Sequence, residues 1–247
     1  METGIEAASN GGEAFRRGGA AFYRFAAACA IAPLAALIFD IAASLVYGAA
    51  PTAERGARDW LELFAASPIL GLQGLSFPQA VTTLLGIPLT AALYLELRGR
   101  GPGWALLALV AGTVGSALFL AQSAALPMLA LGGRWAGATT EAERSALLGA
   151  AEALLARNAD FTPAGCLPFV LPCASWLALA GLMMGSRAFG KGLSILGLAS
   201  FGLVFLFTIG ASFVPGAFSI LVPVSMIGGL GSMAWNVLTA ISLWRMR

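Results

Sequence analysis

Six long runs of apolar residues alternate with shorter polar segments along the chain. The runs cover residues 22–49, 77–97, 104–131, 162–186, 192–213 and 217–244. Each run reaches the roughly 20 residues with which a helix crosses a 30 Å hydrocarbon core. Backbone polar groups must stay hydrogen-bonded in lipid, so each run is expected to be helical. The pattern predicts an all-α fold, a polytopic membrane helix bundle of six transmembrane helices.

The two long connections, at about 50–76 and 132–161, are expected to add two outer amphipathic helices. One covers 57–66, where Trp60, Leu61 and Phe64 recur at helical spacing. The other follows a capping-box pattern at Thr140 and Glu143. Its apolar stripe is Leu147, Leu148, Ala151, Leu154 and Leu155, with Glu143, Arg144 and Arg157 on the opposite face. Such helices suit a lid or partner surface, or rest on the bundle or the lipid headgroups.

The remaining pattern divides the chain into a polar N-terminal segment, 1–21, and a single transmembrane domain, 22–247. The first apolar run is longer than the core of a signal peptide, so no cleavage is expected. In the second run, Pro78 suits a helix start and Pro88 predicts a kink.

The basic residues predict an orientation. The N-terminus as far as Arg24, the two short loops at 97–103 and 186–191 and the C-terminus hold nine of the fourteen Lys and Arg residues. Basic residues favour the cytoplasmic side of a membrane. Both termini are therefore expected in the cytoplasm. The preference for Arg over Lys and the abundance of Ala and Gly suggest a bacterial protein, which places the chain in the inner membrane.

Composition narrows the partners and cofactors. The chain is 59% hydrophobic and 11% charged, with a mean hydropathy of +0.85. These values indicate the lipid bilayer as its surroundings, and the net charge of +2 gives no field for nucleic acid. The chain has no histidine, the commonest metal ligand, so no metal or other cofactor is expected. Cys29, Cys166 and Cys173 lie in apolar runs and are expected to be small buried residues.

No pattern typical of an enzyme occurs. The sequence lacks the zinc-protease, serine-hydrolase and phosphate-loop motifs, and no two carboxylates share an apolar run. The chain is therefore not expected to be an enzyme. An enzyme acting on lipid, with Asp40, Glu96 or the acids of the outer loops, is the last of the hypotheses.

Asp40 is an acid inside the first apolar run. It lies 16 residues after Arg24, or roughly 24 Å along a helix, in the outer part of the core. Ser44 and Tyr47 share its helix face, and Gln122 and Ser123 of the third run are candidate hydrogen-bond donors at similar depth. Arg134 or an arginine of the outer helices could also reach down to it. An intramembrane carboxylate is costly, so it is either a proton or cation site or a hydrogen-bonded peg that fixes the first helix.

Two runs carry polar and small residues at helical spacing. They are Gln79, Thr83, Gly86, Thr90 and Tyr94 in the second run, and Ser225, Gly229, Ser232, Asn236 and Thr239 in the sixth. Each stripe follows one helix face. Turned inward, the two could line a polar cavity, with Thr83, Thr90 and Asn236 as candidate binding residues. Alternatively, both are contact surfaces between helices, as expected for Gly112 with Ser116, Gly181 with Gly185 and Gly228 with Ser232.

Three stretches carry a resemblance to a known family. They are TAALYLELRG at 90–99, ATTEAERSALLGAAEALLARN at 138–158 and MMGSRAFGKGLSILG at 183–197. With the long first outer loop, they make the chain resemble an uncharacterised family of bacterial six-helix membrane proteins, classed as a domain of unknown function. The resemblance implies the fold and supplies no activity or site residue.

Two functional hypotheses remain. The first is binding or transport of a small solute or ion through the helix bundle, which depends on Asp40 and the two polar stripes. The second is a non-catalytic accessory or assembly subunit that binds another membrane protein or a second copy of itself. It depends on the small-residue helix faces and the outer amphipathic helices.

Overall fold

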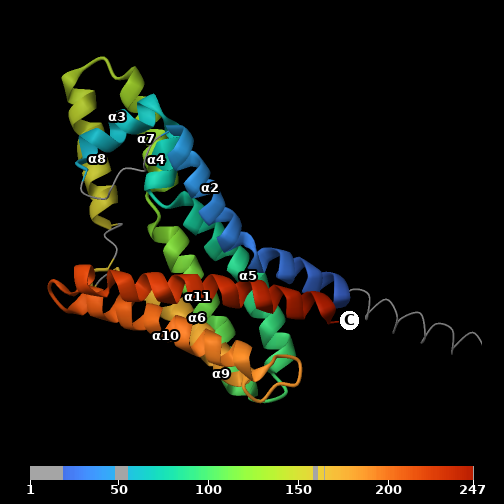
Figure 1. The fold of residues 1–247 in the computed structure, drawn as a ribbon. Helices are drawn as coiled ribbons and strands as arrows, with labels where there is room; N and C mark the ends of the chain where they lie inside the picture. Colours follow the sequence, from blue (N-terminus) through green and yellow to red (C-terminus); the bar gives the residue numbers. More distant parts are fainter. Residues whose placement is uncertain (1–18, 48–54, 158–160, 164, 247) are drawn as a thin grey trace, which may run out of the picture.

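The computed structural model describes residues 19–47, 55–157, 161–163 and 165–246, and these residues form helices joined by turns and loops, without strands (Figure 1). The side chains of residues 40, 41 and 43–47 are not among those described. The predicted all-α helical bundle is confirmed.

Five helical stretches are long and apolar enough to cross a membrane. The first is Gly19–Phe39, which includes the first part of α2 (Ala32–Tyr47), and the third is Pro102–Gly137, which comprises two helices. The others are α5 (Phe77–Leu97), α10 (Lys191–Phe213) and α11 (Ala217–Arg245). The fourth predicted span is the shorter apolar helix α9 (Leu167–Met183), with 17 residues. That length lies at the lower limit for a span.

The prediction for the third span was wrong at its far end. The chain does not continue as one helix to residue 131, because α6 (Pro102–Gln122) stops and α7 (Ala125–Gly137) begins after a break at Ser123 and Ala124. Pro127 accounts for the break, since it has no N–H for the Ser123 carbonyl and suits the first turn of a new helix. Gln122 and Ser123 therefore lie at the end of α6.

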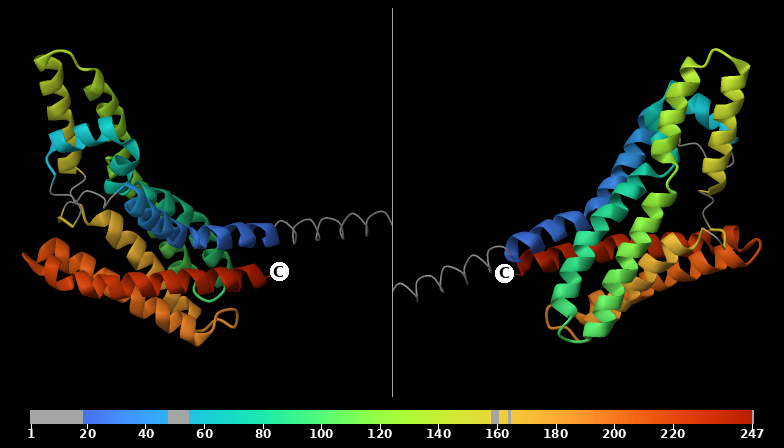
Figure 2. Two further views of the ribbon diagram at one scale, coloured as in Figure 1. Left: turned by 45° about the horizontal axis from the view of Figure 1, so that its top comes forward. Right: turned by 180° about the vertical axis from the view of Figure 1, so that it is seen from behind.

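Four helices form a second packed group at one end of the molecule: α3 (Ala57–Ala66), α4 (Pro68–Gly74), α7 and α8 (Glu141–Arg157) (Figures 1 and 2). Its core includes Trp60, Leu61, Phe64, Met128 and Ala151, all at most 2% exposed. Both helices predicted within the long connections are confirmed, and α3 keeps its predicted bounds. The sequence analysis missed α4 and assigned α7 to the third span.

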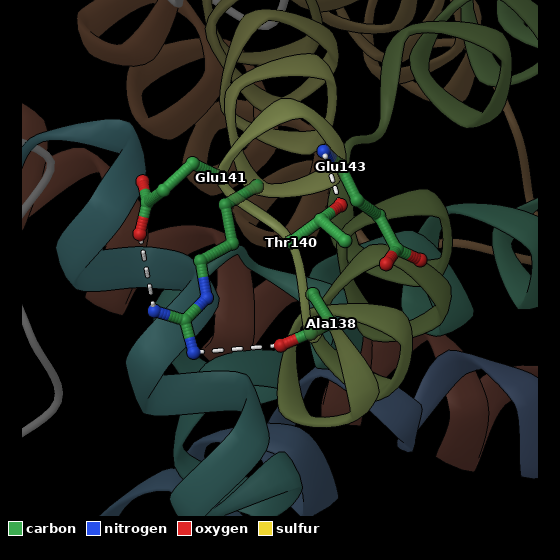
Figure 3. A network of polar contacts seen from close by, with 5 residues as sticks. Ala138, Thr140, Glu141 and Glu143 are labelled. Atoms are coloured by element: carbon green, nitrogen blue, oxygen red, sulfur yellow. Dashed lines mark hydrogen bonds and ion pairs between the residues drawn. The ribbon is translucent and has the colours of Figure 1, made fainter.

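The start of α8 has the predicted cap. The Glu143 N–H donates to Thr140 Oγ1 at 3.2 Å, and Arg144 bridges Glu141 at 3.7 Å and the Ala138 carbonyl at 3.4 Å (Figure 3). At the other end of α8, Arg157 was predicted to face away from the apolar stripe, but its side chain also contacts α6. Its Nη2 donates to the Ala121 carbonyl at 2.7 Å. That carbonyl belongs to the last turn of α6, where helices lack internal donors.

Small residues bring the spans together. A Cβ on Gly115 of α6 would lie 2.7 Å from Pro172 Cγ of α9, and one on Gly228 of α11 would lie 2.9 Å from the Ser200 carbonyl of α10. Ser175 of α9 also donates to the Ala108 carbonyl of α6 at 2.6 Å. Gly112 and Gly228 are thus confirmed as contact glycines. Gly181 is not, because nothing lies within 4 Å of its Cβ position.

The described N-terminal helix, both short basic loops and the C-terminus gather at the end opposite the α3, α4, α7 and α8 group (Figure 1). We call these the basic end and the long-loop end. Arg24 lies 5.9 Å from the centre of the Trp244 ring, which ties the first span to the last. In the described part of the chain, the first helix begins and the last helix ends at the basic end. The predicted cytoplasmic orientation of the two termini stays a prediction.

The outward face of α11 is apolar. Ile220, Ile227 and Leu230 are 75%, 65% and 65% exposed. Apolar area left in water costs about 25 cal/mol per Å², so a surface of this kind needs hydrocarbon around it. Trp104 and Trp244 are exposed at the basic end, where tryptophan suits a membrane interface. The chain is a multi-pass membrane protein by length, composition and surface.

Candidate functional site: a cavity between the spans

A cavity of about 390 Å³ lies between the spans. Every span contributes to its wall: the first with Cys29, Ala30 and Pro33, and then α5, α6, α9, α10 and α11. Ligand pockets in proteins typically measure about 300–1,000 Å³, so this cavity has room for a small molecule.

Two of its walls are the polar faces of α5 and α11. Gln79, Thr83, Gly86 and Thr90 line the cavity from α5, and Ser225, Gly229, Ser232 and Asn236 line it from α11. Of the two alternatives for the stripes, a cavity lining or a contact surface between helices, the cavity lining therefore describes these eight residues. Tyr94 and Thr239, the last members of the two stripes, are not among the lining residues, and Thr239 is fully buried.

The cavity occupies the half of the bundle toward the long-loop end. The first part of α5 and α9 and the last part of α6 and α10 line it. Toward the basic end, a core of fully buried residues such as Leu93, Leu179 and Trp235 fills the space between the helices. Trp176 and Phe201 form the boundary, with ring centres 5.9 Å apart and 5.7 and 5.1 Å from Trp235.

Aromatic rings also gather toward the long-loop end. Phe119, Phe169 and Phe207 line the cavity. Phe161, which precedes α9, stacks on Phe169 at 5.2 Å and meets Phe207 edge-on at 5.0 Å. Phe161 holds a left-handed backbone, with φ of 54°, which non-glycine residues seldom adopt. The rings at both ends make the cavity apolar apart from its hydroxyl and amide groups.

A break in the first span brings that helix to the cavity. The helix is interrupted at Ile31, whose N–H donates three residues back, to the Ala28 carbonyl at 3.2 Å. Pro33 is the cause, since it has no N–H for the Cys29 carbonyl and its ring crowds the preceding turn. Cys29 and Pro33 both line the cavity at this break.

All seven serine and threonine side chains among the described residues of the wall make the same hydrogen bond. Each donates its hydroxyl proton to a carbonyl three or four residues earlier in its own helix, at 2.7–2.9 Å; they are Thr82, Thr83, Thr90, Ser116, Thr208, Ser225 and Ser232. A hydroxyl has one proton and two lone pairs, so each oxygen keeps acceptor capacity.

The structure brings three of the predicted site residues together and leaves two outside the cavity wall, and the side chains of the other three are not among those described. Thr83, Thr90 and Asn236 line one cavity. Gln122 and Ser123 lie at the end of α6 and are not part of its wall. The side chains of Asp40, Ser44 and Tyr47 lie outside those described. Their proposed pairing with Gln122, Ser123 or Arg134 therefore stays a prediction.

The contribution of the first, fourth and fifth spans to the cavity wall was not predicted from the sequence. Trp176 and Phe201 carry no polar signal, because both are apolar residues within apolar runs. Thr208 did have a signal that was not used, since it shares one face of α10 with Ser200 and Ser212 at helical spacing. Ser116 had a signal, its spacing from Gly112, but this was interpreted as helix contact only. Gly112 does make that contact, and Ser116 on the next turn faces the cavity.

The chemistry of the wall is neutral. None of the described residues that line the cavity is charged. No group of three or more His, Cys, Asp or Glu that could hold a metal ion occurs within the described ranges. The free thiols Cys29 and Cys173 add weakly polar surface. The arrangement can therefore bind by shape, by hydrogen bonds and by ring contacts.

Comparison with known proteins gives no family: no family model, no curated protein and no solved structure matches the chain.

Proposed function

We propose that this chain is a bacterial inner-membrane protein, with both termini in the cytoplasm, that binds a small solute within its bundle and carries it. The observation behind the proposal is the cavity of about 390 Å³ walled by all six apolar spans. Ligand sites of helical membrane proteins are commonly formed in this way, between helices that contain breaks.

The asymmetry of the bundle supports carriage as well as binding. Between Trp176 and the basic end, the side chains of Leu93, Leu179 and Leu243 are fully buried and fill that half of the bundle. A site in one half of the bundle with a packed barrier in the other half is what alternating access requires of one of its two states. Pro88, Pro172 and Pro223 lie inside α5, α9 and α11, and Pro33 lies at the start of α2. Helices can bend at such prolines.

Asp40 fits the same proposal through its place in the sequence. It follows Pro33 by seven residues in α2, which is two turns of a regular helix. An acid two turns from the cavity wall suits coupling of solute movement to a proton or cation. Its replacement by Asn removes that charge and is expected to abolish coupling while leaving solute binding in place.

Filling the cavity tests the proposed function. Gly229 lines the cavity, and nothing lies within 4 Å of its Cβ position, so Gly229→Leu projects a side chain into the space without a backbone clash. Gly202→Leu is the matched control, because Gly202 of α10 is equally unobstructed and does not line the cavity. A panel of small solutes is screened by its effect on the melting temperature of the purified protein.

We expect at least one solute to stabilise the wild type and Gly202→Leu but not Gly229→Leu. The same solute should enter proteoliposomes that contain the wild type faster than protein-free liposomes. If no solute distinguishes Gly229→Leu from its control, the proposal is wrong. The role of a non-catalytic accessory subunit would then be the remaining candidate.

A further inference from the structure

The wall of the cavity has more hydrogen-bond acceptors than donors, and this imbalance selects a ligand. Seven hydroxyl oxygens face a cavity whose wall has no charged residue among those described, and each has already given its proton to its own helix. Among the described residues of the wall, the amides of Gln79 and Asn236 have both donors and acceptors, the Trp176 indole has one N–H donor, and the thiols of Cys29 and Cys173 are weak donors.

The imbalance has an energetic consequence. A ligand that brings N–H or O–H groups adds bonds to free lone pairs without disturbing the wall. A ligand that brings only acceptors can bond to the few N–H donors of Gln79, Asn236 and Trp176. Anywhere else on the wall it must first break a helix-bound hydroxyl proton from its carbonyl, and a typical internal hydrogen bond contributes about 1 kcal/mol. An anion is disfavoured further, because it would face oxygen lone pairs and the faces of aromatic rings, both of which carry partial negative charge.

The aromatic residues define the rest of the ligand. Phe119, Phe169, Trp176, Phe201 and Phe207 bring ring surface to both ends of the cavity. Such rings bind apolar groups, and their faces also attract a cationic ammonium. The acceptors and the rings therefore suit the same molecule, one with an apolar body and a donor group.

We infer that the cavity selects small amphipathic hydrogen-bond donors, alcohols or amines with an apolar body, and rejects anions. The inference rests on the proposed solute-binding function and adds the chemical class of the solute. It follows from the back-bonded hydroxyls at Thr82, Thr83, Thr90, Ser116, Thr208, Ser225 and Ser232 and from the aromatic ends of the cavity.

Protection of a cavity thiol tests the inference. Cys173 lines the cavity, so its modification by methyl methanethiosulfonate in wild-type protein, followed on its own peptide by mass spectrometry, reports occupancy. Four probes share a phenylethyl or benzyl body: 2-phenylethanol, 2-phenylethylamine, the methyl ether of 2-phenylethanol, and phenylacetate. The ether keeps the acceptor of the alcohol and loses its donor.

We expect the alcohol, the amine or both to slow modification at concentrations about fivefold lower than the ether or the carboxylate requires, as for the loss of one hydrogen bond. Protection by the amine alone would identify a cation, and protection by both would identify a neutral donor as sufficient. Equal protection by the ether or by phenylacetate would overturn the inference while leaving solute binding intact. Protection by none of the four at any concentration would count against solute binding itself.

Two alanine variants add a second measurement. Ser232→Ala removes an acceptor of the wall, and Ser242→Ala removes an equally back-bonded hydroxyl of the same helix outside the cavity. Ser232→Ala should weaken protection by the favoured donor about fivefold, and Ser242→Ala should not change it. Equal effects of the two variants would overturn the assignment of the hydroxyls as ligand acceptors.

Discussion

Hydroxyl and glycine residues have two different roles in this bundle. Back-bonded hydroxyls satisfy their own protons and turn an acceptor toward the cavity, as at Thr90 and Ser116. Glycines remove the Cβ where another helix lies closest, as at Gly115 and Gly132. In lipid the hydrophobic effect does not drive helices together, so close contact and hydrogen bonds hold them.

The contact at Gly115 predicts a stability change. Gly115→Ala would put a methyl group 2.7 Å from Pro172 Cγ and 3.0 Å from Leu171 Cβ, both of which are held in α9. Overpacking of this kind costs about 1–3 kcal/mol, so unfolding should occur at a lower temperature or denaturant concentration. Gly133→Ala, in α7 with nothing within 4 Å, should instead stabilise by roughly 0.5–1 kcal/mol. An unchanged Gly115→Ala protein would contradict the close contact of α6 with α9.

At the scale of elements, the features that could be predicted are those whose physical causes lie close together in the chain. The apolar stripe of α3 and the cap of α8 were evident because their causes lie within one or two turns. The end of α6 was not predicted, because the apolar run continues unbroken past Ser123 and only Pro127 marks the change. Apolar length therefore overestimated the third span, whose last residues pack on Phe64 in the long-loop group.

The cap of α8 predicts a local change in dynamics. Thr140→Ala removes the acceptor for the Glu143 N–H and should cost about 1 kcal/mol of helix stability. Amide hydrogen exchange in the first turn of α8 should rise about fivefold, because opening becomes that much more frequent. Thr139→Ala, at the exposed neighbouring position, is the control. Equal exchange in the two variants would show that the cap has no role.

At the scale of the whole molecule, the two polar stripes predicted two walls of the cavity but not the cavity itself. Periodicity shows which residues share a helix face, as for Thr83 and Ser232, but not which helices surround that face. That depends on the packing order, in which α6 contacts α9, α9 contacts α10 and α10 contacts α11. The aromatic walls from α9 and α10 follow from this order and from nothing local.

The proposed orientation has its own test. Gly99 lies in a basic loop and Gly149 lies on α8; both are exposed, with nothing within 4 Å of the Cβ position. Each is changed to Cys in a chain whose three cysteines are Ala. A membrane-impermeant maleimide should label Gly149→Cys in intact cells with a permeabilised outer membrane, and Gly99→Cys only after lysis. The reverse pattern would place the termini outside.

The central claim is that the polar faces of α5 and α11 enclose a solvated cavity within the membrane. The most direct measurement compares reaction rates of engineered cysteines with a cationic methanethiosulfonate in lipid nanodiscs, again in the cysteine-free chain. Thr83→Cys and Ser232→Cys report the cavity, and Leu84→Cys and Leu230→Cys, on exposed apolar faces of the same two helices, report the lipid side. Only thiolate reacts, and thiolate forms in water, so the account predicts rates at least about tenfold higher at the two cavity positions. Equal rates at all four positions, or faster reaction at Leu84→Cys and Leu230→Cys, would contradict it.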